Sequence, residues 1–244
     1  MILVIGESCV DVFTYGDCKR LCPEAPVPVF NPTKVIENLG MAYNVYKNLN
    51  SLKNQSRILT NENYKRITKT RFIDKVTNHM FMRLDENDKS YGKCKIKDIN
   101  LSLYDAIVIS DYDKGFLKEK DIEYLANNHK LVFLDTKKNL GSWAKNVKYT
   151  KINLNEYEKT KHLIDDKMYD NLIITMGADG AKHKNIIYPV EEVEIKDVSG
   201  AGDTFLAGLV SQYIKTKCIE TSIKFANDCA TKVVQKKGVS VVWA

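Results

Sequence analysis

Long apolar runs are missing from this sequence of 244 residues, and their absence excludes a membrane-spanning helix, which needs about 20 consecutive apolar residues. The apolar start Met1–Ile5 is too short for a signal peptide and lacks a basic leader. None of the six cysteines forms a CxxC pair, and no histidine stands near the closest couple, Cys18 and Cys22. We therefore expect free thiols rather than a zinc site, in a cytoplasmic protein with no membrane partner.

Concentrated basic charge is also missing. The net charge is +6, but the lysines are spread from end to end, whereas nucleic-acid binders gather basic charge on one face or arm. We expect no nucleic-acid partner, although a mildly positive protein attracts phosphorylated small molecules. Hydrophobic residues make up 44% of the sequence, enough for the core of a single domain over residues 1–244.

Short apolar runs that end in polar or small residues recur along the chain. They are Met1–Ile5, Ala106–Ile109, Leu131–Leu134 and Leu172–Thr175. Amphipathic stretches such as Lys118–Asn127 and Asn155–Asp165 separate them. Buried strands that alternate with helices predict an α/β fold with a mostly parallel sheet covered on both faces. Ligands of such sheets bind beyond the carboxyl ends of the strands.

Two regions depart from this alternation of strands and helices. Val10–Phe30 carries three of the five prolines, and Arg66–Lys97 alternates in places and contains the strand-like Met80–Leu84. Together they predict a small β-layer beside the main sheet. The C-terminal third predicts two helices, Gly202–Lys215 and Ile219–Lys236, and a final strand, Val239–Val242.

The string DVSGAGDTF places small residues and one carboxylate directly before an apolar helix. Free N–H groups and the dipole at a helix start bind anions, and small residues let a ligand approach the backbone. Asp203 in that first turn would repel a bare anion, but it makes sense if a hydroxyl proton must also be removed. The alternative is an ordinary helix start, with glycine for packing and Asp203 complementing the dipole. The Walker and dinucleotide glycine patterns are absent.

These residues resemble the signature of the ribokinase-like (PfkB) sugar kinases. Four further strings are similar to the branch that phosphorylates heptose 7-phosphate: CPEAPVPV at 22–29, ISDYDKG at 109–115, FLDTK at 133–137 and FANDCATKVVQKKGVSVV near the end. Asn153-Leu154-Asn155-Glu156 fits the family's N-x-x-E. The resemblance implies a ribokinase-like three-layer α/β/α sandwich with a central, mostly parallel sheet and a small β-lid from residues 10–30 and 66–97. It also implies ATP and Mg²⁺ as cofactors and a homodimer formed through the lid.

The resemblance also implies roles for individual residues. Asp203 would be the base, and the amides of Gly200, Ala201 and Gly202 would form an anion hole. The implied substrate-binding residues are Asp11, Gly40, Asn44, Arg83 and Lys137. The implied nucleotide-binding residues are Asn153, Thr175, Gly177, Gly180 and Asn227, and Glu156 would hold the metal.

Several of these residues also have an ordinary structural interpretation. Asn153 and Glu156 would also suit a helix cap, and Asp11 an ordinary turn. Arg83 could grip a sugar phosphate or pair with Asp85 or Glu86, and Arg20 is equally open. Lys114 and Lys137 contact phosphate or are surface lysines.

Three departures from the family pattern bear on the substrate. In the loop Asn38–Asn44, Leu39 replaces one glycine of the family's pair, and the bulky Met41 and Tyr43 crowd the rest. The chain is shorter than its relatives after Thr60, which predicts a missing peripheral sheet element. No nucleotidyltransferase domain follows the kinase sequence, so we expect the kinase step alone.

The expected activity is ATP-dependent phosphorylation of a heptose 7-phosphate at its anomeric hydroxyl. The alternatives are a ribokinase-like kinase for another sugar or a nucleoside, or a non-catalytic relative that binds sugar phosphate or nucleotide.

Overall fold

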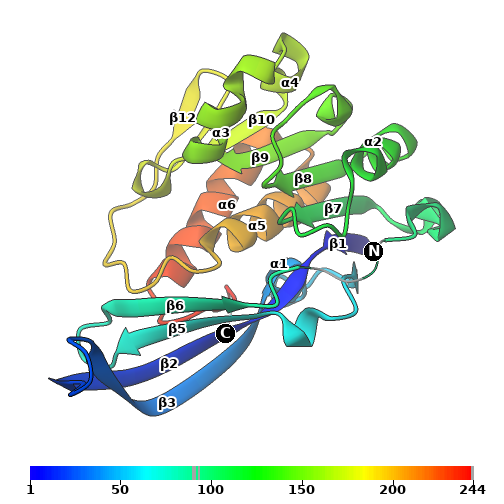
Figure 1. The fold of residues 1–244 in the computed structure, drawn as a ribbon. Helices are drawn as coiled ribbons and strands as arrows, with labels where there is room; N and C mark the ends of the chain where they lie inside the picture. The colour runs from blue at the N-terminus through cyan, green and yellow to red at the C-terminus, as the bar shows by residue number, and fades with distance from the viewer. Residues whose placement is uncertain (90–91, 93, 243–244) are drawn as a thin grey trace.

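The computed structural model describes residues 1–89, 92 and 94–242. Its largest element is an eight-stranded sheet in the order β12-β11-β10-β9-β8-β7-β1-β4 (Figure 1). The strands are β1 (Ile2–Gly6), β4 (Ser56–Leu59), β7 (Ala106–Asp111), β8 (Val132–Thr136), β9 (Tyr149–Asn153), β10 (Leu172–Thr175), β11 (Ala181–His183) and β12 (Ile186–Tyr188). The strands from β4 to β10 pair in parallel, and β11 and β12 add an antiparallel edge. The expected mostly parallel sheet is confirmed.

Helices cover both faces of this sheet. The first layer holds α1 (Ala42–Ser51), α5 (Ala201–Thr216) and α6 (Ile219–Val234), and the second holds α2 (Glu119–Asn128), α3 (Leu154–Thr160) and α4 (Asp166–Asp170). Successive residues of β1 point to opposite faces, so Ile2 and Val4 pack with the first layer and Leu3 and Ile5 with the second. The two cores confirm the three-layer sandwich.

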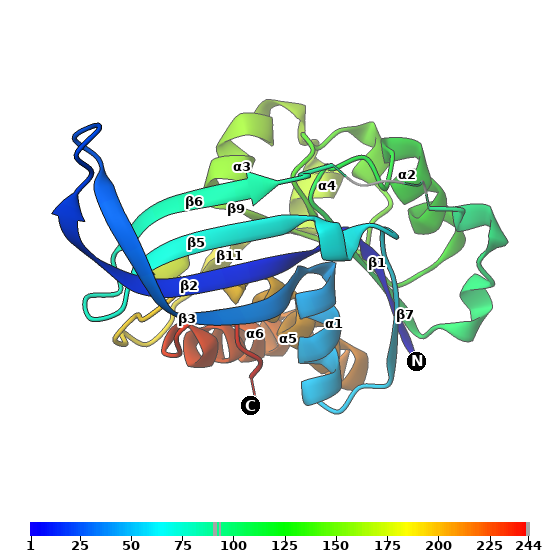
Figure 2. The ribbon, with the colours of Figure 1, turned by 60° about the horizontal axis from the view of Figure 1, so that its bottom comes forward.

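A second sheet of four strands lies beside the sandwich (Figure 2). Its order is β3-β2-β5-β6, with β2 (Ser8–Leu21), β3 (Pro28–Met41), β5 (Thr68–Asp74) and β6 (Met80–Glu86). The predicted β-layer is therefore confirmed, although β3 runs on to Met41, beyond the predicted limit at residue 30. Prolines are tolerated in β3 because it is an edge strand, where a missing N–H need not break the ladder.

Two of the four chain connections between the sheets are short. Glu7 alone separates β1 from β2, and α1 begins directly after Met41, the last residue of β3. Met41 has a φ of 60°, a left-handed conformation that is rare for a bulky side chain. The other two connections, from β4 to β5 and from β6 to β7, are longer.

Shorter helical turns complete the described chain. They are Tyr64–Arg66, Ile96–Asp98, Leu101–Leu103, Ser142–Ala144, Lys161–Leu163 and Gly177–Asp179. Between β4 and β5 the chain contains only the first of these. The predicted helix over Asn155–Asp165 is shorter than expected, because Asp165 caps α4 by accepting a hydrogen bond from the Met168 amide. In the described residues, no helix combines the length and the apolar character needed to cross a bilayer.

The predicted strand Val239–Val242 is wrong. These residues form bends and irregular chain. Val239 packs against Phe13 and Ile73 of the second sheet, whereas Val242 packs in a separate cluster with Leu52. Each apolar side chain fills its own gap between elements, and the backbone pairs with neither sheet.

Candidate active site

The glycine-rich turn at the start of α5 requires its small residues. Gly200 has a φ of 79°, and a Cβ there would lie 2.6 Å from Nδ2 of Asn44. A Cβ on Gly202 would lie 2.9 Å from Nζ of Lys151. The amide of Ala201 already donates to the oxygen of Val198, at 3.2 Å, within the turn. The predicted anion contacts of Gly200, Ala201 and Gly202 stay predictions, and the amide of Ala201 has a competing partner.

Asp203 is almost fully buried in the first turn of α5, with 5% of its surface exposed. The hydroxyl of Tyr112 donates to its Oδ1 at 2.8 Å, and Nδ2 of Asn44 donates to its Oδ2 at 3.2 Å. Burial raises the pKa of Asp203 to about 7; the charge of Asp135 adds to the rise, while the two hydrogen bonds and Lys151 oppose it. The carboxyl therefore titrates near neutral pH.

Lys151 and Asp135 form a buried ion pair beside this carboxyl, at 2.7 Å between Nζ and Oδ2. They lie at the carboxyl-end halves of β9 and β8, and Oδ1 of Asp135 has no hydrogen-bond partner among the described residues. Our sequence reasoning missed Lys151. Its signal is a lone lysine between Thr150 and Ile152, two positions before the N-x-x-E motif.

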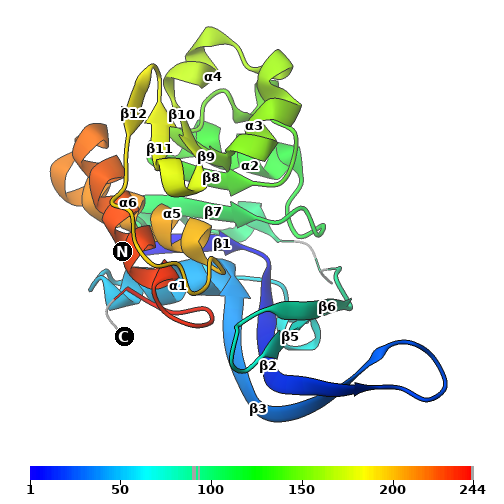
Figure 3. The ribbon, with the colours of Figure 1, turned by 90° about the vertical axis from the view of Figure 1, so that its left-hand side faces the viewer.

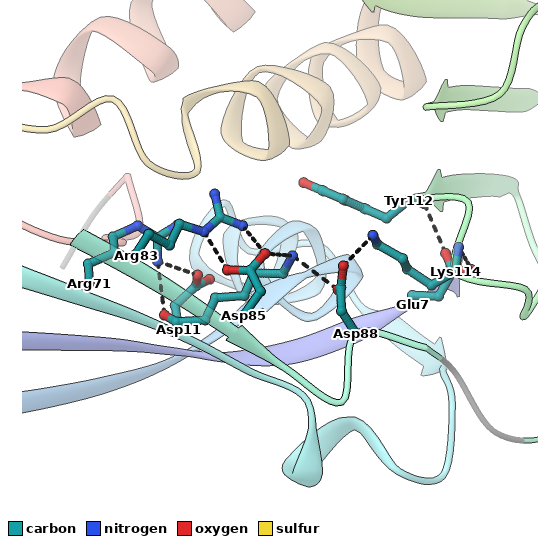
Figure 4. Close-up of polar contacts among 9 residues, drawn as sticks. Glu7, Asp11, Arg71, Arg83, Asp85, Asp88, Tyr112 and Lys114 are labelled. Carbon is teal, nitrogen blue, oxygen red and sulfur yellow. Dashed lines mark hydrogen bonds and ion pairs between the residues drawn. The ribbon is translucent and has the colours of Figure 1, made fainter.

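Asp11 lies on the face of the second sheet turned toward α5 (Figure 4). Its Oδ1 accepts a hydrogen bond from NH1 of Arg71 at 2.7 Å, across the β2–β5 pairing. A Cβ on Gly40 would lie 1.9 Å from Oδ2 of Asp11, so the two predicted substrate residues are packed against each other. Only a glycine at position 40 leaves Asp11 in this place.

The same face carries a chain of further charges (Figure 4). Arg83 donates to both oxygens of Asp85, at 2.7 and 2.8 Å, which is one of the two interpretations left open by the sequence. Lys69 lies 3.5 Å from Asp85 and 3.4 Å from Asp88, and Asp88 also accepts from Lys114. Lys114 follows β7, so this chain links the second sheet to the main one.

Glu7 fixes the loop that carries Tyr112 and Lys114. It is fully buried and accepts three hydrogen bonds, from the amides of Tyr112 at 2.9 Å and of Lys114 and Phe116 at 3.1 Å. Burial, together with the charge of Asp111, raises the pKa of Glu7. Sequence reasoning missed this residue because its partners lie more than 100 positions away.

Asn153 and Glu156 form a capping box at the start of α3. Oδ1 of Asn153 accepts from the Glu156 amide at 2.9 Å, and Glu156 accepts from the Asn153 amide at 2.8 Å. Glu156 also pairs with Lys137, whose Nζ lies 5.5 Å from the centre of the Tyr112 ring. The capping interpretation is realised here, and it places Lys137 beside the Asp203 group.

The other predicted nucleotide residues gather around the turn after β10. Thr175 ends β10, and Gly177 and Gly180 both have positive φ, 63° and 84°. A Cβ on Gly180 would lie 2.1 Å from the oxygen of Tyr188, which accepts from Nδ2 of Asn227 at 2.8 Å. Asn227 thus ties α6 to this turn, and its contact with a nucleotide stays a prediction.

A structural metal site is not formed by protein groups alone in the described part of the chain. Residues 1–89, 92 and 94–242 contain no cluster of three or more His, Cys, Asp or Glu side chains placed to hold a metal ion. Mg²⁺ bound with a nucleotide needs only one or two carboxylates, because phosphates and water supply the other oxygens. Glu156 and Asn153 carry oxygens of the kind that such a shared site uses, and in this structure these oxygens form the capping box and the ion pair with Lys137.

The three-layer sandwich with its second sheet is a ribokinase-like fold. The structure is similar to ribokinase of Thermotoga maritima, with a TM-score of 0.74, 16% identity, and coverage of 98% of this chain and 94% of that chain. It is also similar to the nucleoside kinase of Methanocaldococcus jannaschii, with a TM-score of 0.72, 18% identity, and coverage of 98% and 92%. At these identities the likeness shows the fold alone.

The chain belongs to the pfkB family of carbohydrate kinases, whose family model matches residues 69–243. Membership places it among the phosphotransferases that act on a sugar hydroxyl. Its sequence is 29% identical to bifunctional protein HldE of Helicobacter pylori strain HPAG1, over 97% of this chain and 63% of that protein. It is 30% identical to the HldE of Sulfurimonas denitrificans, over 99% and 62%. The chain therefore spans less than two thirds of the length of these curated relatives.

Both alignments are longer than the chain itself, at 295 and 297 positions against 244 residues. They therefore contain gaps in this chain, as expected for a shortened member. The place of the shortening, after Thr60, stays a prediction.

Proposed function

We propose that this protein transfers the γ-phosphoryl group of ATP to a sugar hydroxyl, with Asp203 as the base. The observation that carries the proposal is a buried carboxyl, fixed by Tyr112 and Asn44 at a glycine-rich helix start. Burial there raises the pKa of Asp203 to about 7. A base of this pKa is matched to proton transfer near neutral pH. Family membership supports the same reaction class.

In this mechanism Asp203 accepts the proton of the attacking hydroxyl as the oxygen approaches phosphorus. The amides of Gly200 and Gly202, and the positive end of α5, stabilise charge on the transferring group. The ammonium of Lys151, next to the Gly202 backbone, adds a fixed positive charge. Tyr112 and Asn44 hold the two oxygens of Asp203, so its orientation is set before substrate binds.

Magnesium would be held by Glu156 and Asn153 together with phosphate oxygens. When bound, the ion neutralises charge on the phosphates of ATP. Lys137, the partner of Glu156 in this structure, would add a further positive charge beside these phosphates.

We propose a heptose 7-phosphate as the substrate and its anomeric hydroxyl as the acceptor. The motifs at 22–29 and 109–115 support this choice, and so do three cationic side chains on one face of the second sheet. Lys69, Arg71 and Arg83 lie there on the paired strands β5 and β6, each beside an aspartate that a phosphate would replace as its partner. A bidentate arginine and a lysine are the usual partners of a phosphate monoester.

The testing experiment measures ATP consumption with heptose 7-phosphate, fructose phosphates, ribose and nucleosides, in the wild type and the Asp203→Asn variant. Turnover should be fastest with heptose 7-phosphate. Faster turnover of a nucleoside or ribose would assign this protein to that substrate instead of heptose 7-phosphate. Binding of sugar phosphate without any turnover would leave the non-catalytic alternative.

Gly40→Ala is expected to weaken sugar binding, because the added methyl group displaces the Asp11 carboxylate from Arg71. Loss of a charge-assisted hydrogen bond corresponds to a rise of about 10- to 100-fold in the KM for sugar. The KM for ATP should stay unchanged. Gly141→Ala is the matched control, since its methyl group would meet only the Trp143 ring, at 3.2 Å. Equal KM values for Gly40→Ala and the wild type would remove Asp11 from the sugar site.

We propose that the second sheet also forms a homodimer. Its hairpin β2–β3 projects beyond the rest of the molecule (Figure 3). Eight of the fifteen exposed large hydrophobic residues of the described chain belong to this sheet or its turns: Leu21, Val27, Val35, Val76, Met80, Phe81, Met82 and Leu84. Light scattering should give about twice the 27.8 kDa chain mass, and Leu84→Lys should shift it toward the monomer. A monomeric mass for the wild type would end this proposal.

A further inference from the structure

Two buried asparagine side chains on α1 form a row of hydrogen-bonded amide groups that ends at Asp203. Asn44 and Asn48 stand one turn apart on α1, and both are fully buried. Nδ2 of Asn44 donates to Oδ2 of Asp203 at 3.2 Å and to the oxygen of Gly200 at 3.4 Å. Nδ2 of Asn48 donates to Oδ1 of Asn44 at 3.1 Å, and the Val242 amide donates to Oδ1 of Asn48 at 3.2 Å.

The direction of this row is fixed at its far end. A backbone N–H can only donate, whereas an asparagine amide has one accepting and one donating end. The Val242 amide therefore requires the oxygen of Asn48, which leaves the Asn48 nitrogen to face Asn44. The Asn44 oxygen is occupied in turn, and only its NH₂ group remains to face Asp203.

We propose that Asn48 is a positioning residue that, held by the Val242 amide, keeps the NH₂ group of Asn44 turned toward the Asp203 carboxylate. The inference rests on the proposed function in one respect, that Asp203 acts as the base. Asn48 touches neither Asp203 nor the glycine turn, so it acts only through Asn44.

The remaining groups around Asp203 do not depend on this row. Tyr112 donates from the loop after β7, and the charges that face the carboxyl come from β8, β9 and the chain after β8: Asp135, Lys151 and Lys137. Cys9 of β2 faces it as well. None of these residues hydrogen-bonds to Asn48. When Asn48 is replaced, the Asn44 side chain is the one partner of Asp203 that loses its fixed orientation. It is then free to rotate and turn its oxygen toward Asp203. A carboxylate facing an oxygen keeps its proton more tightly, so the pKa of Asp203 rises.

The test is Asn48→Leu, read out on the Asp203 carboxyl itself by ¹³C NMR of protein with labelled aspartate. The signal that is lost in Asp203→Asn assigns the resonance. We expect a wild-type midpoint of about 7 and an upward shift of about 1 unit in the variant. Turnover should fall about eightfold at pH 6.5, recover at pH 9, and leave the KM for ATP unchanged.

Asn54→Leu is the matched control. Asn54 follows α1, and its Nδ2 donates to Oγ of Ser211 on α5 at 2.8 Å and to the oxygen of Leu49 at 3.1 Å. Its replacement also removes hydrogen bonds between α1 and α5, so it should lower Tm without moving the Asp203 midpoint. If Asn48 had only a structural role, both variants would lower Tm and neither would move the Asp203 midpoint.

The outcomes separate the inference from the proposed function. A shifted midpoint in a protein that phosphorylates no sugar supports the role of Asn48 and rejects the kinase. An unchanged midpoint in folded, Asp203-dependent kinase overturns the role of Asn48. If Asn48→Leu does not fold, Asn48→Ala takes its place. The smaller alanine removes the amide without adding a charge, and the same titration decides.

Discussion

Asp203→Asn is expected to reduce kcat by about 10²- to 10⁴-fold, the usual contribution of a general base. The asparagine keeps the size of the side chain and accepts from Tyr112, but it cannot take up the hydroxyl proton. Affinity for ATP should stay within about twofold, because the amides of the turn are backbone groups and remain in place. Isothermal titration of ATP and steady-state kinetics measure the two effects separately.

The same variant is expected to be more stable than the wild type at high pH. The pKa of Asp203 is raised from 3.8 to about 7, so the folded state binds a proton between these values that the unfolded state does not. The stability that this proton provides is present at low pH and is lost as the pH rises toward 7. The neutral asparagine avoids that loss, and we expect a gain of about 1–3 kcal/mol at pH 8 that disappears near pH 4.

Asp228→Asn is the control for both effects, since Asp228 is an exposed aspartate on α6. It changes the same charge outside the site and should alter neither kcat nor Tm. Near-normal turnover by Asp203→Asn would refute the assignment of the base, and equal stability at pH 8 and pH 4 would refute the account of its pKa.

Lys151→Met is expected to be the most destabilising single change. It leaves Asp135 charged and buried, with its Oδ1 already unpartnered. Breaking a buried pair in this way costs about 3–5 kcal/mol, which lowers the Tm of a chain of this size by about 6–20 °C. Turnover should fall as well, because the ammonium beside Gly202 and Asp203 is lost.

Two further variants test whether the broken ion pair causes the loss of stability in Lys151→Met. Lys151→Met combined with Asp135→Leu should regain most of the stability, because an apolar pair needs no compensating charge, yet its turnover should stay as low as that of Lys151→Met. Lys145→Met breaks an exposed pair with Asp165 and should cost less than about 1 kcal/mol. A double variant as unstable as Lys151→Met alone would show that the ion pair is not the source.

The parallel sheet could be predicted from the sequence because four of its strands, β1, β7, β8 and β10, are continuous apolar runs with polar residues at their ends. The strands β4, β9, β11 and β12 lack such runs and were not predicted. Val239–Val242 shows the limit of the method: apolar β-branched residues are equally suited to a strand and to an irregular segment that fills two separate gaps. The local sequence pattern does not show whether a neighbouring strand or a gap between elements lies beside these residues.

Which residues of the candidate site lie close together could be predicted only where one motif contains them. Asp203 and Gly200 stand in one string, so their proximity follows from sequence. Asp11 and Arg71 are 60 positions apart and meet only through the pairing of β2 with β5. Lys151 and Glu7 likewise depend on partners from distant strands, which spacing along the chain cannot reveal.

The short connections between the two sheets decide how the molecule can close over a substrate. No loop of free residues separates β1 from β2 or β3 from α1, so at two of its four connections the second sheet has no flexible joint. Any approach toward α5 has to bend the backbone at Glu7 and at Met41. The resting gap is then set by backbone stiffness at these two positions, and a substitution of Glu7 also reaches the site, because Glu7 fixes the loop that carries Tyr112.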